Sequence, residues 1–297
     1  MTTRDAGMAV PDWPNTYGRN LLLYPWKTWL FGPWDLLIEH GHRLLGALAG
    51  LVTIGLVWSV FVCESRRWMR PVALGTLLLV ILQGSLGGAR VLLDERQLAM
   101  LHGCVAHAFF SLAVALAVVT SRWWRGHPTG VLERLDPPIA RRITRLTIFT
   151  CALASLQILL GAWLRHIAWY DTAGMFRTVL WMHLFTSAAI AIHAILLWNA
   201  TVQGGDGLSV LKRSTQGLVL LVCIQIGLGC ATWVLNYSWP GPMGRFLFAA
   251  RHVPVRGSMS QSLTTTAHVA VGSLILALSI QTAVRWFRIL WCYRSGR

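Results

Sequence analysis

Charged residues are scarce in this chain, and acidic residues are the scarcest of them. Only 12% of the 297 residues are charged, with 11 Asp and Glu against 26 Lys and Arg, whereas 55% are hydrophobic. A soluble domain carries about a quarter charged residues, so this composition excludes an ordinary soluble enzyme. Because the apolar runs are long and continuous, the sequence predicts an all-α integral membrane protein and not a barrel of short alternating strands.

Cysteine motifs are also lacking. The six cysteines form no C-x-x-C and no C-x-x-C-H pattern, which argues against a zinc ribbon and against covalently attached c-type haem. None of them falls in an expected outer loop, so no disulfide framework is indicated. The first 18 residues lack the apolar run of a signal peptide and are expected to form an exposed, turn-rich segment.

Seven apolar stretches are long enough to cross a bilayer. They lie at about 36–63, 71–91, 98–120, 146–164, 180–200, 216–236 and 263–283. Fifteen Lys and Arg residues fall in the segments 64–70, 121–145, 201–215 and 284–297. By the positive-inside rule these segments face the cytoplasm, which predicts a multi-pass protein of the bacterial inner membrane with its N-terminus outside and its C-terminus in the cytoplasm. The positive charge therefore reflects topology in a lipid bilayer, and no nucleic-acid partner is expected.

The spans repeat as two similar halves. Each half has a histidine near the outer end of one helix, a glutamine 41 or 42 residues later, and another histidine on the next helix. These residues are His42, Gln83 and His102 in the first half, and His183, Gln225 and His268 in the second. The repeat predicts two pseudo-symmetric four-helix-bundle halves. The expected parts are an outer N-terminal segment (1–35), an N-terminal half (36–120), a cytoplasmic linker (121–145), a C-terminal half (146–283) and a cytoplasmic tail (284–297).

One helix of this repeat is missing from the first half. In the second half, "LQILLGAWLRH" at 156–166 precedes His183, whereas the equivalent stretch before His42 falls in a loop. A two-fold repeat of four helices therefore predicts an eighth span upstream of Met1. A start codon placed too late and a true loss of the helix are the two explanations, and the first is favoured.

Four histidines lie at one expected depth, about 5–10 Å below the outer edge: His42, His102, His183 and His268. Ionisable residues inside a membrane are costly and usually functional. Two imidazoles on different helices suit an iron porphyrin, which takes one axial ligand on each side of an apolar disc. Zinc would need a third or fourth ligand. The two pairs predict two porphyrin sites, with propionates meeting arginines near the outer surface: Arg90, Arg165, Arg177, Arg245, Arg251 and Arg256.

Glu39 precedes His42 by three residues, so helical spacing places the two on one face. An acid near the start of a helix is stabilised by the helix dipole whatever else it does, and this interpretation stays open. The corresponding position in the second half is Leu180. A carboxylate in one half alone favours chemistry in that half. His40 points away from His42 and is assigned to packing or to the membrane interface.

Glycines recur on the helices that carry the repeated glutamines. They are Gly84, Gly87, Gly88, Gly227 and Gly229. Close contact between helices is one interpretation. A flat ligand that lies against the bare backbone is the other.

Six motifs together resemble the haem A synthase family. They are "AGMAVPDWPNTYG", "EHGHRLLG", "LQGSLGGARVLLD", "LHG", "LLGAWLRH" and "TTTAHVAVGSLILA", in that family's order from about residue 5 to residue 283. The resemblance implies eight helices in two four-helix halves and an enzyme that converts haem O to haem A by oxidising a ring methyl to a formyl group. The chain departs from the family by lacking the first helix and the outer-loop cysteine pairs that many members carry.

The resemblance also implies a role for each site residue. His183 and His268 would hold a haem b cofactor, while His42 and His102 would flank the substrate haem O. Glu39 would lie near the carbon that is oxidised. Haem O synthase, a farnesyltransferase, and cytochrome oxidase assembly factors are the protein partners that this function implies.

Two other functions remain as alternatives. The first is a bis-histidine diheme electron carrier that exchanges electrons with quinone and leaves its haem unchanged. The second is a transporter that uses Glu39 and histidines as a proton relay, although it gives no reason for four histidines at one depth. Extracted pigment separates the first from the enzyme, because a carrier yields only protohaem b.

Overall fold

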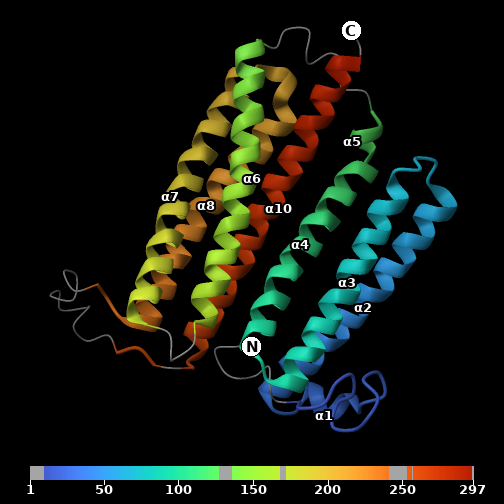
Figure 1. Cartoon of the computed structure of the whole chain (residues 1–297), viewed down its shortest axis with the longest axis vertical. Coiled ribbons are helices and arrows are strands. Elements are labelled where there is room, and N and C mark those ends of the chain that lie inside the picture. The colour runs from blue at the N-terminus through green and yellow to red at the C-terminus, as the bar shows by residue number, and fades with distance from the viewer. Residues whose placement is uncertain (1–9, 127–135, 168–171, 241–252, 256, 296–297) are drawn as a thin grey trace. The chain divides into compact units, whose positions relative to one another are not determined.

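The computed structural model describes residues 10–126, 136–167, 172–240, 253–255 and 257–295. Within these residues the regular structure is helical, and seven helices are long and apolar enough to cross a membrane (Figure 1). These helices are α2 (Trp34–Cys63), α3 (Met69–Leu93), α4 (Arg96–Thr120), α6 (Pro137–His166), α7 (Ala173–Gln203), α8 (Ser209–Tyr237) and α10 (Met259–Ser295). The predicted all-α membrane fold with seven spans is confirmed. Three short helices join them: α1 (Trp26–Leu30), α5 (Arg122–Arg125) and η3 (Asp206–Leu208).

Two helices extend well beyond the apolar stretches that predicted them. Helix α6 already begins at Pro137, at a position where proline is favoured because the first helical N–H has no acceptor, and Asp136 precedes it as the N-cap residue. Helix α10 runs on to Ser295. The added turns contain arginines that a bilayer would exclude, but helical hydrogen bonding does not stop where the apolar stretch ends. Hydropathy therefore predicts the membrane part of each helix and not its full length.

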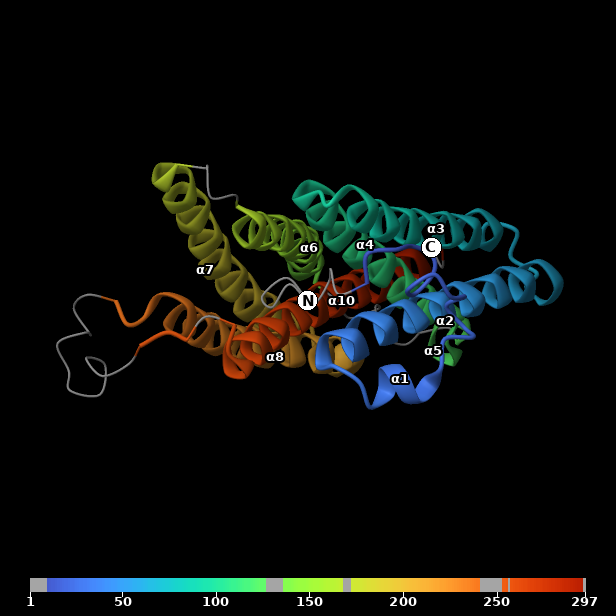
Figure 2. The ribbon, with the colours of Figure 1, turned by 90° about the horizontal axis from the view of Figure 1, so that it is seen from below.

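The chain forms two compact units, Met1–Phe109 and Phe110–Arg297. The division falls inside α4, whereas the sequence placed the end of the first half at residue 120. In the N-terminal unit α2 packs against α3, and α1 lies beside α2, as Figure 2 shows. Residues 10–20, called here the N-terminal segment, fold back onto the start of α2 through contacts described below.

The C-terminal unit is a four-helix bundle. Around it α6 contacts α7, α7 contacts α8, α8 contacts α10, and α10 closes the ring against α6 (Figure 1). One buried cluster includes Leu197, Leu211 and Trp286, and the Trp286 indole N–H donates to the Thr144 hydroxyl at 2.9 Å. A second cluster fills the bundle nearer to the histidines. This packing holds α7 and α10 in a fixed register, and each of these helices carries one histidine of the C-terminal pair.

Candidate functional site

The C-terminal unit brings two of the predicted histidines together. The ring centroids of His183 on α7 and His268 on α10 lie 6.4 Å apart, with the ring planes tilted by 55°. A glutamine from a neighbouring helix reaches each ring. The side-chain amide nitrogen of Gln157 is 3.1 Å from Nε2 of His183, and that of Gln225 is 3.4 Å from Nε2 of His268. Both rings are half-buried in the bundle.

The N-terminal unit holds the other pair in a similar arrangement. The centroids of His42 on α2 and His102 on α4 are 6.1 Å apart, and the rings meet edge to face at 79°. Gln83 on α3 contacts both nitrogens of His102. Its backbone carbonyl oxygen is 3.0 Å from Nδ1, and its side-chain amide nitrogen is 3.3 Å from Nε2. His42 differs from the other three because its side chain is exposed.

The spacing of both pairs fits one metal ion with an imidazole on each side. Metal–imidazole bonds of about 2 Å would separate two such ring centroids by roughly 6 Å, close to the observed values. In the C-terminal unit, Nδ1 of His183 and Nδ1 of His268 are buried without a hydrogen bond. Within the described residues no cluster of three or more His, Cys, Asp or Glu side chains could hold a metal. Two imidazoles per site leave four metal positions for other donors, as a porphyrin requires.

Glu39 lies at the start of α2 with both carboxylate oxygens hydrogen-bonded. Glu39 is buried, with an exposed fraction of 2%. Oε1 accepts from the Arg43 guanidinium at 2.8 Å, and Oε2 accepts from the backbone N–H of Val10 at 3.1 Å. The carboxylate thus joins α2 to the N-terminal segment. It is held in one position by a cation one helical turn away.

Arg43 is a site residue that sequence reasoning missed. Besides Glu39, its guanidinium donates to the backbone carbonyl oxygens of Asp12 (2.6 Å), Asn15 (2.7 Å) and Val10 (2.8 Å). A planar guanidinium can serve several acceptors at once in this way. The sequence did carry a signal, since an acid and an arginine four residues apart on a helix commonly form an ion pair.

His40 has a packing role, as its position on the helix indicated. It is 1% exposed, and its Nδ1 is 3.0 Å from the hydroxyl of Thr16. The ring lies between the aromatic rings of Tyr24 and Trp29, with centroid distances of 5.3 and 5.0 Å. In "EHGHR", therefore, Glu39, His40 and Arg43 contact the N-terminal segment. Only the second histidine of the motif pairs with another histidine.

The glycines divide into two groups. Gly84 and Gly227 have no atom within 4 Å of the place where a Cβ would be, whereas Gly87 and Gly229 face histidine rings. The indole of Trp13 lies directly against Gly88, so any side chain there would collide with it. At these three crowded positions a ring of this chain, and not a second helix backbone, fills the space that the missing side chain leaves.

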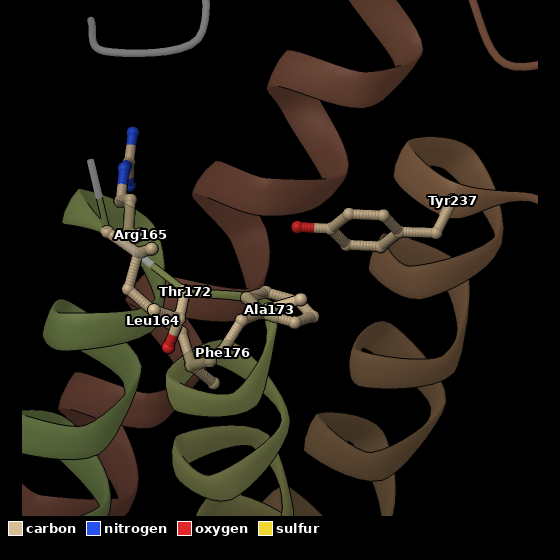
Figure 3. A pocket seen from close by; sticks show the side chains of 7 residues that line it. Leu164, Arg165, Thr172, Ala173, Phe176 and Tyr237 are labelled. Atoms are coloured by element: carbon tan, nitrogen blue, oxygen red, sulfur yellow. The ribbon is translucent and has the colours of Figure 1, made fainter. Parts of the chain in front are cut away.

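The arginines expected near the propionates are only partly described. Arg165 lines a cavity of about 370 Å³ at the α7 end that lies nearer to His183. In Figure 3 the ring of Tyr237 on α8 extends toward Phe176 on α7, and these ring centroids are 5.7 Å apart. Arg177 donates to the Ala173 carbonyl of its own helix. Arg90 also lies in the described part, on α3; Arg245, Arg251 and Arg256 lie outside the described residues.

The known proteins that the chain resembles are a family of cytochrome oxidase assembly proteins and two heme A synthases. Residues 34–176 match the model of the family described as "Cytochrome oxidase assembly protein". The heme A synthase of Symbiobacterium thermophilum is 33% identical over 141 residues, which cover 45% of each chain. The heme A synthase of Shouchella clausii is 25% identical over 155 residues, which cover 52% of this chain and 48% of that protein. The chain thus spans about half the length of the curated relatives it matches. No solved structure matches it.

Proposed function

We infer that this chain, which is similar over residues 34–176 to a family of cytochrome oxidase assembly proteins and also to two heme A synthases, acts in haem A biosynthesis as a membrane oxidoreductase. The proposed reaction converts haem O to haem A by oxidising a porphyrin methyl to a formyl group. This four-electron oxidation takes its oxygen atom from water or dioxygen and passes its electrons to an acceptor outside the chain. The observation that supports it best is the pair of histidines in each unit, with ring centroids 6.1 and 6.4 Å apart. These separations suit one haem per unit, which an enzyme with a haem cofactor and a haem substrate requires.

Each unit would bind a different haem. Haem b would lie between His183 and His268 and would supply one-electron redox chemistry when bound. The substrate haem O would lie between His42 and His102. One feature supports this division: Glu39 lies in the same unit as His42 and three residues from it, whereas the corresponding position in the C-terminal unit is Leu180.

The residues of the N-terminal unit would orient the substrate and handle charge. The backbone carbonyl of Gln83 accepts from Nδ1–H of His102, which leaves Nε2 unprotonated. The side-chain amide of Gln83 contacts that Nε2 at 3.3 Å, so it would have to move aside for iron to bind there. Arg43 and Val10 hold the carboxylate of Glu39 in place. That carboxylate would stabilise positive character at the methyl carbon during oxidation, or accept a proton as oxygen is introduced. Trp13, packed on Gly88, would help to exclude water from the site.

The function is tested by pigment analysis. Cells that express the chain together with a haem O source should accumulate haem A, which is extracted and identified by chromatography and mass spectrometry. The control is the same strain with an empty vector. Haem O that remains unconverted in the presence of a membrane-inserted, haem-b-loaded protein would contradict the proposal.

A diheme electron carrier remains the second candidate. It is favoured by the near equality of the two histidine pairs, and by the fact that both oxygens of Glu39 are already bonded within the protein. A carrier would bind protohaem b in both units and would convert no haem O. Two equivalents of protohaem b per chain, with no haem O or haem A in the extract, would support it over the enzyme.

We also propose the topology indicated by the charge distribution. The seven apolar helices make this a multi-pass membrane protein. Reporter fusions at residue 130 and at the C-terminus should be active in the cytoplasm, and fusions at residues 170 and 250 should be active outside. Haem O synthase and cytochrome oxidase assembly factors are the proposed partners on this membrane. A cytoplasmic residue 250 would put His268 at the wrong end of its helix for a shared depth with His183.

A further inference from the structure

Three of the four paired histidines meet the same two residue types on a neighbouring helix. A glutamine and a glycine four residues further on face each ring. The pairs are Gln83 and Gly87 on α3 beside His102, Gln157 and Gly161 on α6 beside His183, and Gln225 and Gly229 on α8 beside His268. This Gln-x-x-x-Gly element recurs in both units on three helices, and in each of them a leucine directly precedes the glycine.

The contacts are nearly the same each time. The glutamine amide nitrogen lies 3.3, 3.1 and 3.4 Å from Nε2 of His102, His183 and His268, respectively. A Cβ added to the glycine would lie 2.9, 3.3 and 3.2 Å from Cε1 of the same rings. Separations below about 3.4 Å are tighter than ordinary Cβ contacts. Each ring therefore occupies the space that a side chain would fill at the glycine.

The spacing of four has a physical reason. In an α-helix the carbonyl of residue i accepts from the N–H of residue i+4, and its second lone pair points past that later residue. A glycine at i+4 leaves this lone pair open to a neighbouring side chain. In the N-terminal unit the Gln83 carbonyl uses it, at 3.0 Å from Nδ1 of His102. The same residue thus contacts both nitrogens of one ring.

The glutamine amides would be unfavourable here without such a role. The side-chain oxygens of Gln83, Gln157 and Gln225 are all buried without a hydrogen-bond partner. A buried polar atom without a partner costs free energy, and the cost is larger in an apolar surrounding. An apolar side chain at these three positions would avoid it. Their shared contact to Nε2 is the one feature that accounts for all three.

We propose that the Gln-x-x-x-Gly element orients the ligand histidines of this protein. The glycine admits the ring to the helix backbone. The glutamine amide contacts Nε2 and fixes the rotation of the ring, and it gives up that nitrogen when iron binds while remaining beside the ring. These glutamines and glycines are positioning residues, because they act through the imidazole. The inference rests on the proposed function only in taking haem iron as the group that the imidazoles bind. Second-layer contacts of this kind commonly control metal affinity.

The glycine half of the element is tested with a pair of matched variants. Gly229→Ala adds a methyl group against His268, whereas Gly227→Ala adds the same group on the same helix with no atom within 4 Å. The purified full-length chain is titrated with protohaem in detergent, and binding is followed by the Soret band. Gly229→Ala is expected to weaken binding in the C-terminal unit about 10–100-fold, and Gly227→Ala is expected to leave it unchanged.

The glutamine half needs a change that adds no bulk at the backbone. Gln157→Leu removes the amide beside His183, and Ser155→Ala is its control, because the Ser155 hydroxyl donates to the Cys151 carbonyl of its own helix. The g-values of the low-spin ferric haem and its midpoint potential are measured in the protein that still binds haem. Both should shift in Gln157→Leu and stay at wild-type values in Ser155→Ala. A residue that only stabilised the bundle would lower the yield and leave these two properties unchanged.

The outcomes separate this inference from the proposed function. If the wild type binds low-spin haem and the element variants behave like their controls, the orienting role is wrong and the haem assignment stands. If the wild type forms no low-spin haem, both fall. If Gly229→Ala fails to fold, as judged by its helical circular dichroism and melting, Gln225→Leu tests the same ring without a backbone clash. Wild-type affinity and g-values in that variant would also overturn the proposal.

Discussion

Replacement of His183 or His268 by leucine is expected to remove low-spin bis-histidine haem b from the purified protein. These rings are the two side chains of the C-terminal unit whose spacing, 6.4 Å between centroids, suits axial ligation of one iron. Loss of either one leaves a single imidazole, which converts a six-coordinate low-spin centre into a five-coordinate high-spin one or releases the haem. The change is read from the optical spectrum and from electron paramagnetic resonance, and near-complete loss of the low-spin signal is expected.

The C-terminal unit supplies its own control for this experiment. His193 lies on the same helix as His183, but its Nδ1 is 2.8 Å from the Ala189 carbonyl of that helix and its ring contacts Phe149. His193→Leu therefore removes a membrane histidine without touching the pair, and its low-spin spectrum should match that of the wild type. Unchanged low-spin haem b in both His183→Leu and His268→Leu would show that this pair does not ligate the iron.

Glu39→Gln should lower haem A formation about 100-fold or more while leaving haem b bound to the C-terminal unit. The substitution keeps the size of the side chain and an oxygen that accepts from Val10 N–H, but it removes the negative charge. General acid–base or electrostatic roles of a carboxylate are typically worth at least about 10²-fold in rate. Pigment analysis should show haem O, or a partly oxidised product, in place of haem A. If Glu39 only held Arg43 and the N-terminal segment, the change would destabilise the fold, because a buried cation loses its charged partner, but it would leave the activity of the folded protein nearly intact.

The contacts of Arg43 allow a role of Glu39 in the reaction to be distinguished from a role in holding the N-terminal segment on α2. In Glu39→Gln the guanidinium still reaches three backbone carbonyls, so the N-terminal segment should stay protected from limited proteolysis. Arg43→Gln removes those contacts and leaves the carboxylate buried without its partner, a loss that typically costs about 3–5 kcal/mol. This second variant should expose the segment to protease. Wild-type haem A yields in Glu39→Gln, or cleavage of the segment in that variant, would remove the case for a direct role of Glu39.

The fold was predictable to the extent that it depends on transfer from water to lipid. Apolar stretches of about 20 residues identify spans whatever their neighbours are, and all seven were confirmed. The start of α6 and the end of α10 were not predictable in this way, because these added turns are held by helix hydrogen bonds and by contacts such as that of Trp286 with Thr144. The division into units inside α4 depends on tertiary packing, which no hydropathy pattern encodes.

The site was predictable where it depends on spacing along a helix. Equal depth in a repeated frame identified four histidines, and the structure brings them together as His42 with His102 and His183 with His268. The contact of Glu39 with the Val10 N–H could not be found in this way. Val10 lies in an irregular segment 29 positions earlier, where the chain has no periodicity. Likewise, the spacing of Gln225 and Gly229 is visible in the sequence, but that a ring from another helix enters between them is visible only in three dimensions.

The order in which the chain is synthesised determines which contacts of the two units can form first. The acceptors of Arg43 precede it by 28 to 33 residues, and the length-dependent entropy of closing such a loop is only about 3 kcal/mol. In the proposed topology, the N-terminal segment can therefore dock once the start of α2 has reached the outer side of the membrane, without waiting for Gly88 or His102 to arrive there. His268, by contrast, is the last of the four paired histidines to be translated. Both histidines of the first pair are thus made before the second pair is complete, so a chain that ends before residue 268 would keep the proposed haem ligands His42 and His102 and lose one ligand of the C-terminal pair.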